Sequence, residues 1–112
     1  MNGSNLTIEN GVARTYYKNG ALATETEVDE NGVSHGLSKV FLKDGSLRAE
    51  GHNVHGKMEG VWRWYRPDGT PWTVGNFVLN SREGEWLRYK KDGTLEVTKM
   101  FKDDKEISSV KA

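Results

Sequence analysis

Residues 60–80 read GVWRWYRPDGTPWTVGNFVLN, and this stretch decides the fold. Its aromatic and β-branched residues are typical of strands, and Pro67-Asp68-Gly69 interrupts them in the middle. Hairpin turns require positive φ, which glycine adopts without strain and which Asp or Asn tolerates. The stretch therefore predicts a strand, a tight turn and a second strand.

The same pattern occurs four times along the chain. Each unit has a glycine, a Tyr or Phe five residues later, and then an Asn-Gly or Asp-Gly pair. The copies are Gly11…Tyr16…Asn19-Gly20, Gly36…Phe41…Asp44-Gly45, Gly60…Tyr65…Asp68-Gly69 and Gly84…Tyr89…Asp92-Gly93. Such a period indicates units that bury their apolar groups by stacking on their neighbours. We expect one repeat domain over 1–112, with repeats at approximately 11–35, 36–59, 60–83 and 84–107 and caps at 1–10 and 108–112.

A second set of turn residues separates one predicted hairpin from the next. These are Asn31-Gly32, His55-Gly56, Asn80-Ser81 and Asp103-Asp104. The sequence thus predicts an all-β fold, a single-layer curved antiparallel meander of four repeated hairpins with about eight strands. Leu6-Thr7-Ile8 would add an extra N-terminal strand, and the last residues would cover the other end. Apolar positions do not recur at helical spacing, so we expect at most one helical turn, near the C-terminus.

Two glycines fall in the middle of predicted strands, where glycine costs about 0.5–1 kcal/mol relative to alanine. They are Gly51 and Gly75, whereas Thr26 and Lys99 stand at the same position in the first and last units. We predict that rings such as Trp62 and Trp86 lie across the glycine of a neighbouring strand. Strict alternation would also place Leu47 on the same face as Asn53.

Composition limits the classes of function. Sixteen basic and sixteen acidic residues give zero formal net charge, so neither nucleic acid nor an anionic membrane is an expected partner. The chain has no cysteine, which excludes disulfides and thiolate chemistry. The first residues lack the features of a signal peptide, and no apolar stretch approaches the roughly 18–20 residues that span a bilayer. We expect a cytoplasmic protein.

The third and fourth units resemble the MORN repeat. The matching residues are Gly60, Trp62, Tyr65, Asp68, Gly69 and Gly75, and Gly84, Trp86, Tyr89, Asp92, Gly93 and Leu95. The spacing is similar to the variant found in bacterial antitoxin and immunity proteins. The resemblance covers residues 11 to about 105 and implies a binding scaffold. Some bacterial members neutralise a toxin, and eukaryotic relatives attach proteins to membranes or to each other. Ala13 and Ser38 replace the tryptophan in units one and two.

Side chains that could carry chemistry have plainer explanations. His52 and His55 are three residues apart, which in a strand sends them to opposite faces, so we expect no metal. Glu25 and Glu27 would lie roughly 6.5–7 Å apart, a spacing open to a glycosidase, but nothing beside them supplies a cleft or a raised pKa. We therefore predict neither an enzyme nor a cofactor.

The acidic cluster has two open interpretations. Glu25, Glu27, Asp29 and Glu30 stand close together without a base, where unit one exceeds the 24-residue period. The cluster could be a solvated loop. It could also face a basic partner such as a nucleic-acid-modifying toxin, steering association and setting orientation.

Tryptophan and arginine crowd the third unit. Trp62 and Trp86 belong to the repeat pattern and are expected to build the scaffold, whereas Trp64 and Trp72 lie outside it. Exposed Trp and Arg are enriched in interface hot spots, so we predict partner contacts for Trp64, Trp72 and Arg66. Stacking on single-stranded nucleic acid is an alternative that balanced charge disfavours.

Together these observations predict a non-enzymatic protein-binding module. The resemblance implies an immunity or antitoxin protein that neutralises a cognate toxin by occlusion. The alternative is a structural scaffold or self-association module without a toxin partner. We expect a monomer rather than a homo-oligomer, and no membrane attachment.

Overall fold

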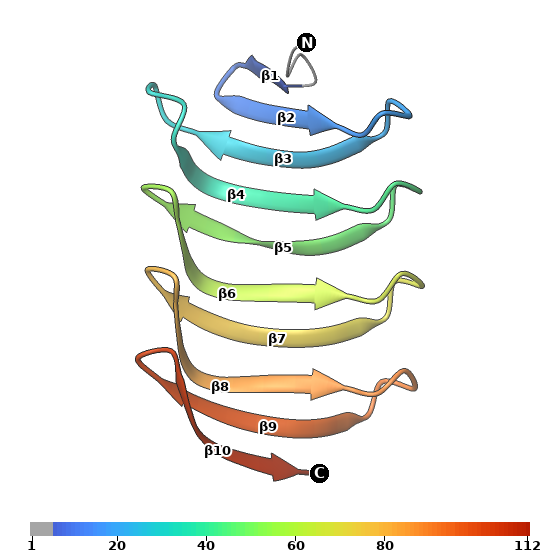
Figure 1. Cartoon of the computed structure of the whole chain (residues 1–112), viewed down its shortest axis with the longest axis vertical. Helices are drawn as coiled ribbons and strands as arrows, with labels where there is room; N and C mark the ends of the chain where they lie inside the picture. Colours follow the sequence, from blue (N-terminus) through green and yellow to red (C-terminus); the bar gives the residue numbers. More distant parts are fainter. Residues whose placement is uncertain (1–5) are drawn as a thin grey trace.

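A computed structural model of the protein describes residues 6–112. They form one ten-stranded sheet in which each strand pairs antiparallel with its neighbours in sequence, from β1 to β10 (Figure 1). The sheet is an open, curved single layer that measures 46 × 30 × 22 Å. No helix occurs in this described part of the chain. The predicted all-β meander is confirmed.

Four hairpins form the repeats, and one further strand is added at each end. The strands are β1 (Leu6–Glu9), β2 (Val12–Tyr16), β3 (Leu22–Val28), β4 (Ser34–Phe41), β5 (Leu47–Val54), β6 (Lys57–Tyr65), β7 (Pro71–Val78), β8 (Ser81–Tyr89), β9 (Leu95–Lys102) and β10 (Lys105–Lys111). The expected eight strands become ten, and the predicted N-terminal strand is present as β1. The C-terminal segment forms a strand and no helical turn. Residues 1–5 of the predicted N-terminal cap lie outside the described residues.

The hairpin turns are held by their own side chains. In the third repeat, Asp68 Oδ1 accepts hydrogen bonds from the hydroxyl and the N–H of Thr70, at 2.7 and 2.9 Å. Gly69 between them has a φ of 90°, which an L side chain rarely adopts. Asp44 with Ser46 and Asp92 with Thr94 repeat these bonds. In each case these two hydrogen bonds lower the pKa of the aspartate, and the bond from the hydroxyl has the larger effect.

Each hairpin contains a β-bulge at the same place. Trp64 pairs with Thr73 and Tyr65 pairs with Pro71, which leaves Trp72 as an extra residue. The corresponding extra residues in the other repeats are Ala23, Arg48 and Glu96. The bulge breaks the alternation of side chains. The prediction that Leu47 shares a face with Asn53 is therefore wrong, because Val40 pairs with Ala49 but Phe41 pairs with Leu47.

Tryptophan rings fill the space above the two mid-strand glycines. A Cβ on Gly51 would overlap the indole of Trp62, and a Cβ on Gly75 would overlap that of Trp86. The indole N–H groups donate to backbone carbonyls of the glycine-bearing strands, 2.9 Å from Trp62 to His52 and 3.2 Å from Trp86 to Asn76. The predicted packing of rings on glycines is confirmed.

This pairing also explains the repeats that depart from the pattern. Each ring covers the glycine of the strand just before its own. On β3, Thr26 stands at the position of the glycine, and on β4, Ser38 stands at the position of the tryptophan. A hydrogen bond of 2.8 Å between their hydroxyls replaces the packing of ring on glycine. The strand before β10 carries Lys99, and β10 has no aromatic residue. Glycine thus occurs where the following strand supplies a tryptophan.

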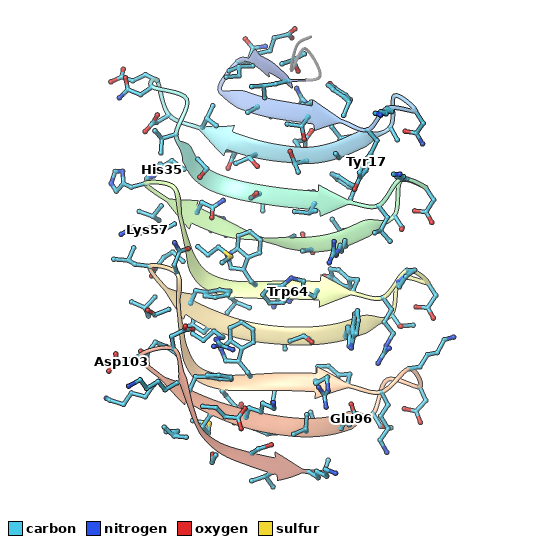
Figure 2. The ribbon with its side chains drawn as sticks, in the orientation of Figure 1. Tyr17, His35, Lys57, Trp64, Glu96 and Asp103 are labelled. Atoms are coloured by element: carbon cyan, nitrogen blue, oxygen red, sulfur yellow. The ribbon has the colours of Figure 1, made fainter. Side chains whose placement is uncertain are left out.

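The turns between hairpins are tied to the preceding repeat. Glu59 Oε1 accepts a hydrogen bond from the N–H of Leu79 at 2.9 Å, and Glu83 Oε1 accepts one from Asp103 at 2.6 Å. His35 takes this position one repeat earlier, where its Nδ1 accepts from the N–H of His55 at 3.4 Å. Figure 2 places His35 and Asp103 on one rim of the sheet and Trp64 over its middle.

Candidate partner-binding surface

One face of the sheet carries a continuous ladder of rings. Trp64 lies 6.2 Å from Trp62 and 5.6 Å from Trp86, measured between ring centroids. Phe77 packs edge-on against Trp86 at 5.0 Å, and Trp86 meets Phe101 at 5.8 Å. The register explains the ladder, because Trp64 opposes the small Thr73 and the rings of Trp62 and Trp86 each lie over a glycine. The ladder gives the single-layer sheet a rigid apolar surface.

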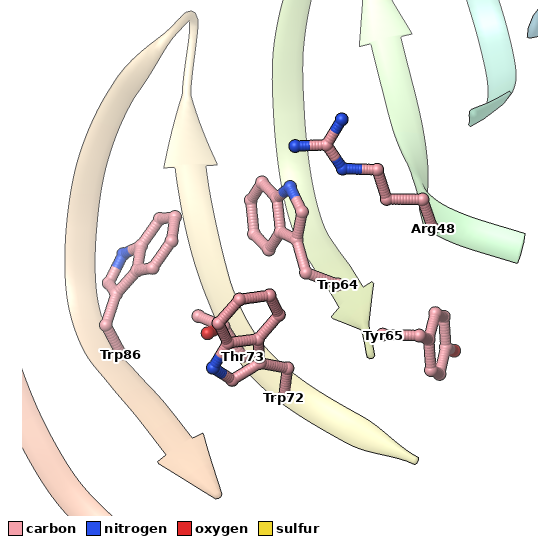
Figure 3. A pocket seen from close by; sticks show the side chains of 6 residues that line it. All are labelled: Arg48, Trp64, Tyr65, Trp72, Thr73 and Trp86. Carbon is pink, nitrogen blue, oxygen red and sulfur yellow. The ribbon is translucent and has the colours of Figure 1, made fainter. Parts of the chain in front are cut away.

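The ladder opens into a pocket of about 290 Å³ over the third repeat, with walls from the second and fourth repeats. Its lining residues are Arg48, Trp64, Tyr65, Trp72, Thr73 and Trp86 (Figure 3). They come from four successive strands, β5 to β8. Arg48 and Trp72 are both bulge residues, so the bulges supply two of the walls.

The polar groups of the pocket are mainly hydrogen-bond donors. Within residues 6–112, neither the guanidinium of Arg48 nor the indole N–H groups of Trp64 and Trp72 have a hydrogen-bond partner or an ion pair. Arg48 is exposed, and Figure 3 shows its guanidinium directed toward Trp64. Tyr65 is engaged elsewhere, since its hydroxyl donates to Glu50 Oε2 at 2.8 Å. Burial, followed by this bond, raises the pKa of Tyr65.

Trp64 and Trp72, both predicted as partner contacts, lie together in this pocket. Trp64 is half-buried between its neighbours, and Trp72 remains 42% exposed. Trp62 belongs to the core, as expected, with 5% exposure. Trp86 has two roles, because it covers Gly75 and also forms a wall of the pocket.

Arg66, the third predicted anchor, does not line the pocket but lies against Trp72, one of its walls. Its Nη2 donates to the carbonyl of Tyr89 in the next repeat at 2.9 Å. Its guanidinium carbon lies 5.0 Å from the ring centre of Trp72, a cation–π arrangement. Nε is buried without a hydrogen-bond partner in the described residues. Arg66 is half-buried and lies against Trp72, and its contact with a partner stays a prediction.

The acidic cluster lies on β3 and the following turn, and its carboxylates are largely engaged within the sheet. Glu25 forms an ion pair with Arg14 Nε at 2.9 Å, and Glu27 Oε1 accepts from the N–H of Leu37 at 2.6 Å.

The turn residues of the cluster differ from each other. Asp29 Oδ1 accepts from the N–H groups of Asn31 and Val33 at 2.9 and 3.0 Å. The bond from Val33 is the main cause that lowers the pKa of Asp29. Glu30 is exposed. A partner contact by these acids stays a prediction, and the pocket on β5 to β8 is a separate surface.

Sequence reasoning did not find Arg48 as a pocket residue. A signal was present, because Arg48 and Trp72 stand at the same position of successive repeats. Its meaning depends on the bulges, which the alternation pattern does not reveal. For the histidines, the ring of His55 lies 5.1 Å from that of His35. No group of three His, Cys, Asp or Glu side chains able to hold a metal occurs among the described residues. Nor does any helix there have the length and apolar character to cross a membrane.

Comparison with known families gives one match. The family described as "MORN repeat variant" matches residues 9–30, 58–78 and 82–103. The intervening stretch 31–57 is unmatched, and it contains Ser38 in place of the tryptophan. No curated protein matches the chain.

Among solved structures, the crystal structure of TarM is similar to this chain with a TM-score of 0.55. The alignment covers 94% of this chain at 14% identity, and 21% of the TarM chain. At this identity the likeness concerns the fold alone. The aligned region spans about a fifth of the length of the TarM chain.

Proposed function

Because the chain belongs to the MORN repeat variant family, we propose that it is a non-catalytic module that binds another protein. The observation that carries the proposal is the open pocket of three tryptophans on a rigid repeat sheet. Trp and Arg are the residues that most often dominate binding energy at interfaces. A site built on regular strands also holds its side chains more precisely than a site on loops.

The chemistry of the pocket favours binding over catalysis. Its lining consists of aromatic rings, the hydroxyl of Thr73, the hydroxyl of Tyr65, which is bonded to Glu50, and the guanidinium of Arg48. General acid–base catalysis needs a group that titrates near the working pH and lies within reach of the substrate. None of the lining residues is a carboxylate or a histidine. The pocket is suited to hold an apolar group from a partner.

We further propose that the partner is a toxin and that the module neutralises it by covering its active surface. The choice rests on the 24-residue spacing of the repeats, which we interpret from the sequence as resembling the variant of bacterial antitoxin and immunity proteins. The exposed Glu27 and Glu30 support a basic partner, because charge complementarity steers association.

Co-expression tests this proposal. A neighbouring reading frame with a toxic C-terminal domain is expressed with and without the chain, and survival and complex formation are measured together. We expect rescue together with a stoichiometric complex on gel filtration. Rescue without a complex, or a complex in which the toxin stays active, would contradict occlusion.

Self-association is a second candidate function, which the open sheet edge favours. The last strand leaves Ile107 and Val110 exposed by 64% and 63%. An exposed edge can pair with another chain, although Lys105 and Lys111 oppose such pairing. Light scattering over a range of concentrations decides between the candidates. A dimer that disappears on replacing Val110 by lysine would favour self-association, and a monomer at all concentrations would remove it.

A further inference from the structure

We propose that the pocket between Trp64, Trp72 and Trp86 receives a large apolar side chain of the partner together with a carboxylate next to it, which Arg48 binds. The inference rests on the proposed function in one respect, namely that the ligand belongs to a protein. It adds the chemistry of the recognised group.

The apolar part follows from the walls of the pocket. Three indoles surround a space of about 290 Å³, close to the lower limit of about 300 Å³ for ligand pockets. The indoles of Trp64 and Trp86 are tilted by 34° with their centroids 5.6 Å apart, so a third ring can pack against both. A space of this size suits one large side chain.

The anionic part follows from the free donors. Trp62 and Trp86 donate their indole N–H groups to backbone carbonyls. Those of Trp64 and Trp72 have no acceptor within residues 6–112, and both residues line the pocket. Arg48 adds the N–H groups of its guanidinium, and no carboxylate lines the pocket. A carboxylate accepts hydrogen bonds only, so it matches a site that offers donors.

Arg48 differs from three other cations of this face because it has no acidic partner within residues 6–112. Arg88 pairs with Glu96 at 2.9 Å, Arg82 with Asp104 at 2.7 Å and Lys99 with Glu106 at 3.0 Å.

The repeat explains why Arg48 is unpaired. Glu96 stands at the bulge position of the fourth repeat, and its partner Arg88 lies on the adjacent strand. In the second repeat Arg48 takes the bulge position, and Val40 takes that of Arg88. The sheet supplies no carboxylate to Arg48, so the ligand can supply it. Arginine binds carboxylates in a bidentate geometry, which also sets orientation.

A titration followed by NMR tests the inference on the intact chain. The indole N–H resonances of the four tryptophans report on the pocket and on the core separately. The probes are N-acetylphenylalanine, the peptide acetyl-Phe-Glu-amide and N-acetylphenylalanine amide, which has the ring without the charge. The first two distinguish a C-terminal carboxylate from a side-chain carboxylate. Acetate and a short oligothymidylate complete the set.

We expect at least one of the two carboxylate probes to shift the resonances of Trp64 and Trp72, with Trp62 unchanged. It should bind about fivefold more tightly than the amide, the upper end of what an exposed ion pair contributes. Acetate should cause no shift at the same concentration. Equal affinity for the acids and the amide would overturn the inference. Tighter binding of oligothymidylate than of either acid would do so as well, because it would make the pocket a base-stacking site.

Matched variants locate the charge. Arg48→Ala should lower the affinity of the acid to that of the amide and leave the amide unaffected. Arg63→Ala is the control, since Arg63 is also exposed but lies on the other face, one residue before Trp64. If Arg48→Ala and Arg63→Ala bind the acid like the native chain, Arg48 is not the carboxylate site.

The two proposals fail in different ways. If no probe shifts the indole resonances while the chain still neutralises its toxin, the pocket inference is wrong and the proposed function stands. If the acids bind selectively and co-expression rescues no toxin, toxin neutralisation is wrong and the pocket chemistry stands.

Discussion

Replacing Gly75 by alanine changes one hydrogen into a methyl group, yet it should strongly destabilise the sheet. Gly75 does not have a positive φ, so alanine can adopt its backbone conformation. The new Cβ would overlap the six-membered ring of Trp86, and a rigid ring cannot yield by rotating a flexible end. The indole must therefore move away from the sheet.

The cost can be worked from the contacts of that indole. Trp86 packs against Trp64, Phe77 and Phe101, and each aromatic pair contributes about 0.5–1.5 kcal/mol. Its hydrogen bond to the carbonyl of Asn76 contributes about 1 kcal/mol. Alanine also stabilises the folded state by about 0.4–1 kcal/mol, because it lowers the conformational entropy of the unfolded chain. The expected net loss is about 3 kcal/mol, comparable with the about 3–5 kcal/mol for truncating a buried tryptophan to alanine.

Urea unfolding followed by circular dichroism measures this loss, and a double-mutant cycle assigns its cause. In a Trp86→Leu background the ring is absent, so Gly75→Ala should be neutral or slightly stabilising. The reasoning is refuted if Gly75→Ala alone stays within about 0.5 kcal/mol of the native chain, the range of ordinary surface substitutions. It is equally refuted if the cost is the same in both backgrounds.

Three further predictions concern single groups. Trp72→Ala should reduce partner affinity by about 2 kcal/mol, the threshold of a hot spot, and reduce unfolding stability by less than about 1 kcal/mol, because the side chain is 42% exposed; calorimetry with the partner and urea unfolding separate the two effects, and equal losses in both would count against a binding role. The pKa values of Asp44, Asp68 and Asp92 lie below 3.8, chiefly through the hydroxyls of Ser46, Thr70 and Thr94. Their contribution to stability is present above the unfolded pKa and is lost as pH falls through the folded pKa. The urea concentration at the unfolding midpoint should therefore decrease when the pH is lowered below about 4, and this decrease should be smaller in a Thr70→Val variant. The pKa of Tyr65 is raised above 10.0 by burial and then by Glu50, so its contribution is present below the unfolded pKa and is lost as pH rises through the folded one; an ultraviolet titration should find the tyrosinate of Tyr65 appearing at higher pH than in a Glu50→Gln variant.

Much of the fold could be predicted from residues that act locally. Asp68-Gly69 and its equivalents form turns because of their own backbone and side-chain preferences, and these survive in any surroundings. The match of Gly75 with Trp86 was also predictable, since a mid-strand glycine indicates a bulky neighbour. Strict alternation failed at Leu47, because a bulge is set by the pairing of two strands and leaves little trace in either one.

The candidate site was predictable in part for the same reason. Trp64 and Trp72 stood out because they lie outside the repeat pattern. Arg66 was predicted to contact a partner, and this stays a prediction; what the sequence did not indicate is that Arg66 also lies against Trp72 and donates to the carbonyl of Tyr89. The sequence placed Glu25 and Glu27 in one acidic cluster but did not indicate that Glu25 pairs with Arg14 and that Glu27 accepts from the N–H of Leu37. Arg14 and Leu37 lie 11 and 10 residues from the glutamates that they contact, on the strands that pair with β3.

By itself the sequence determined the period of the repeat, the places where the chain turns and the packing of rings on the mid-strand glycines, because these depend on local backbone geometry and on fixed spacing. Only the tertiary structure decided that Arg48 and Trp72 share a pocket and that Arg48 lacks an acid. Both facts depend on bulges that shift the side-chain phase by one residue and on which residue then lies opposite on the next strand. That register is a property of the assembled sheet, since each strand is aligned by its neighbours and not by its own residues alone.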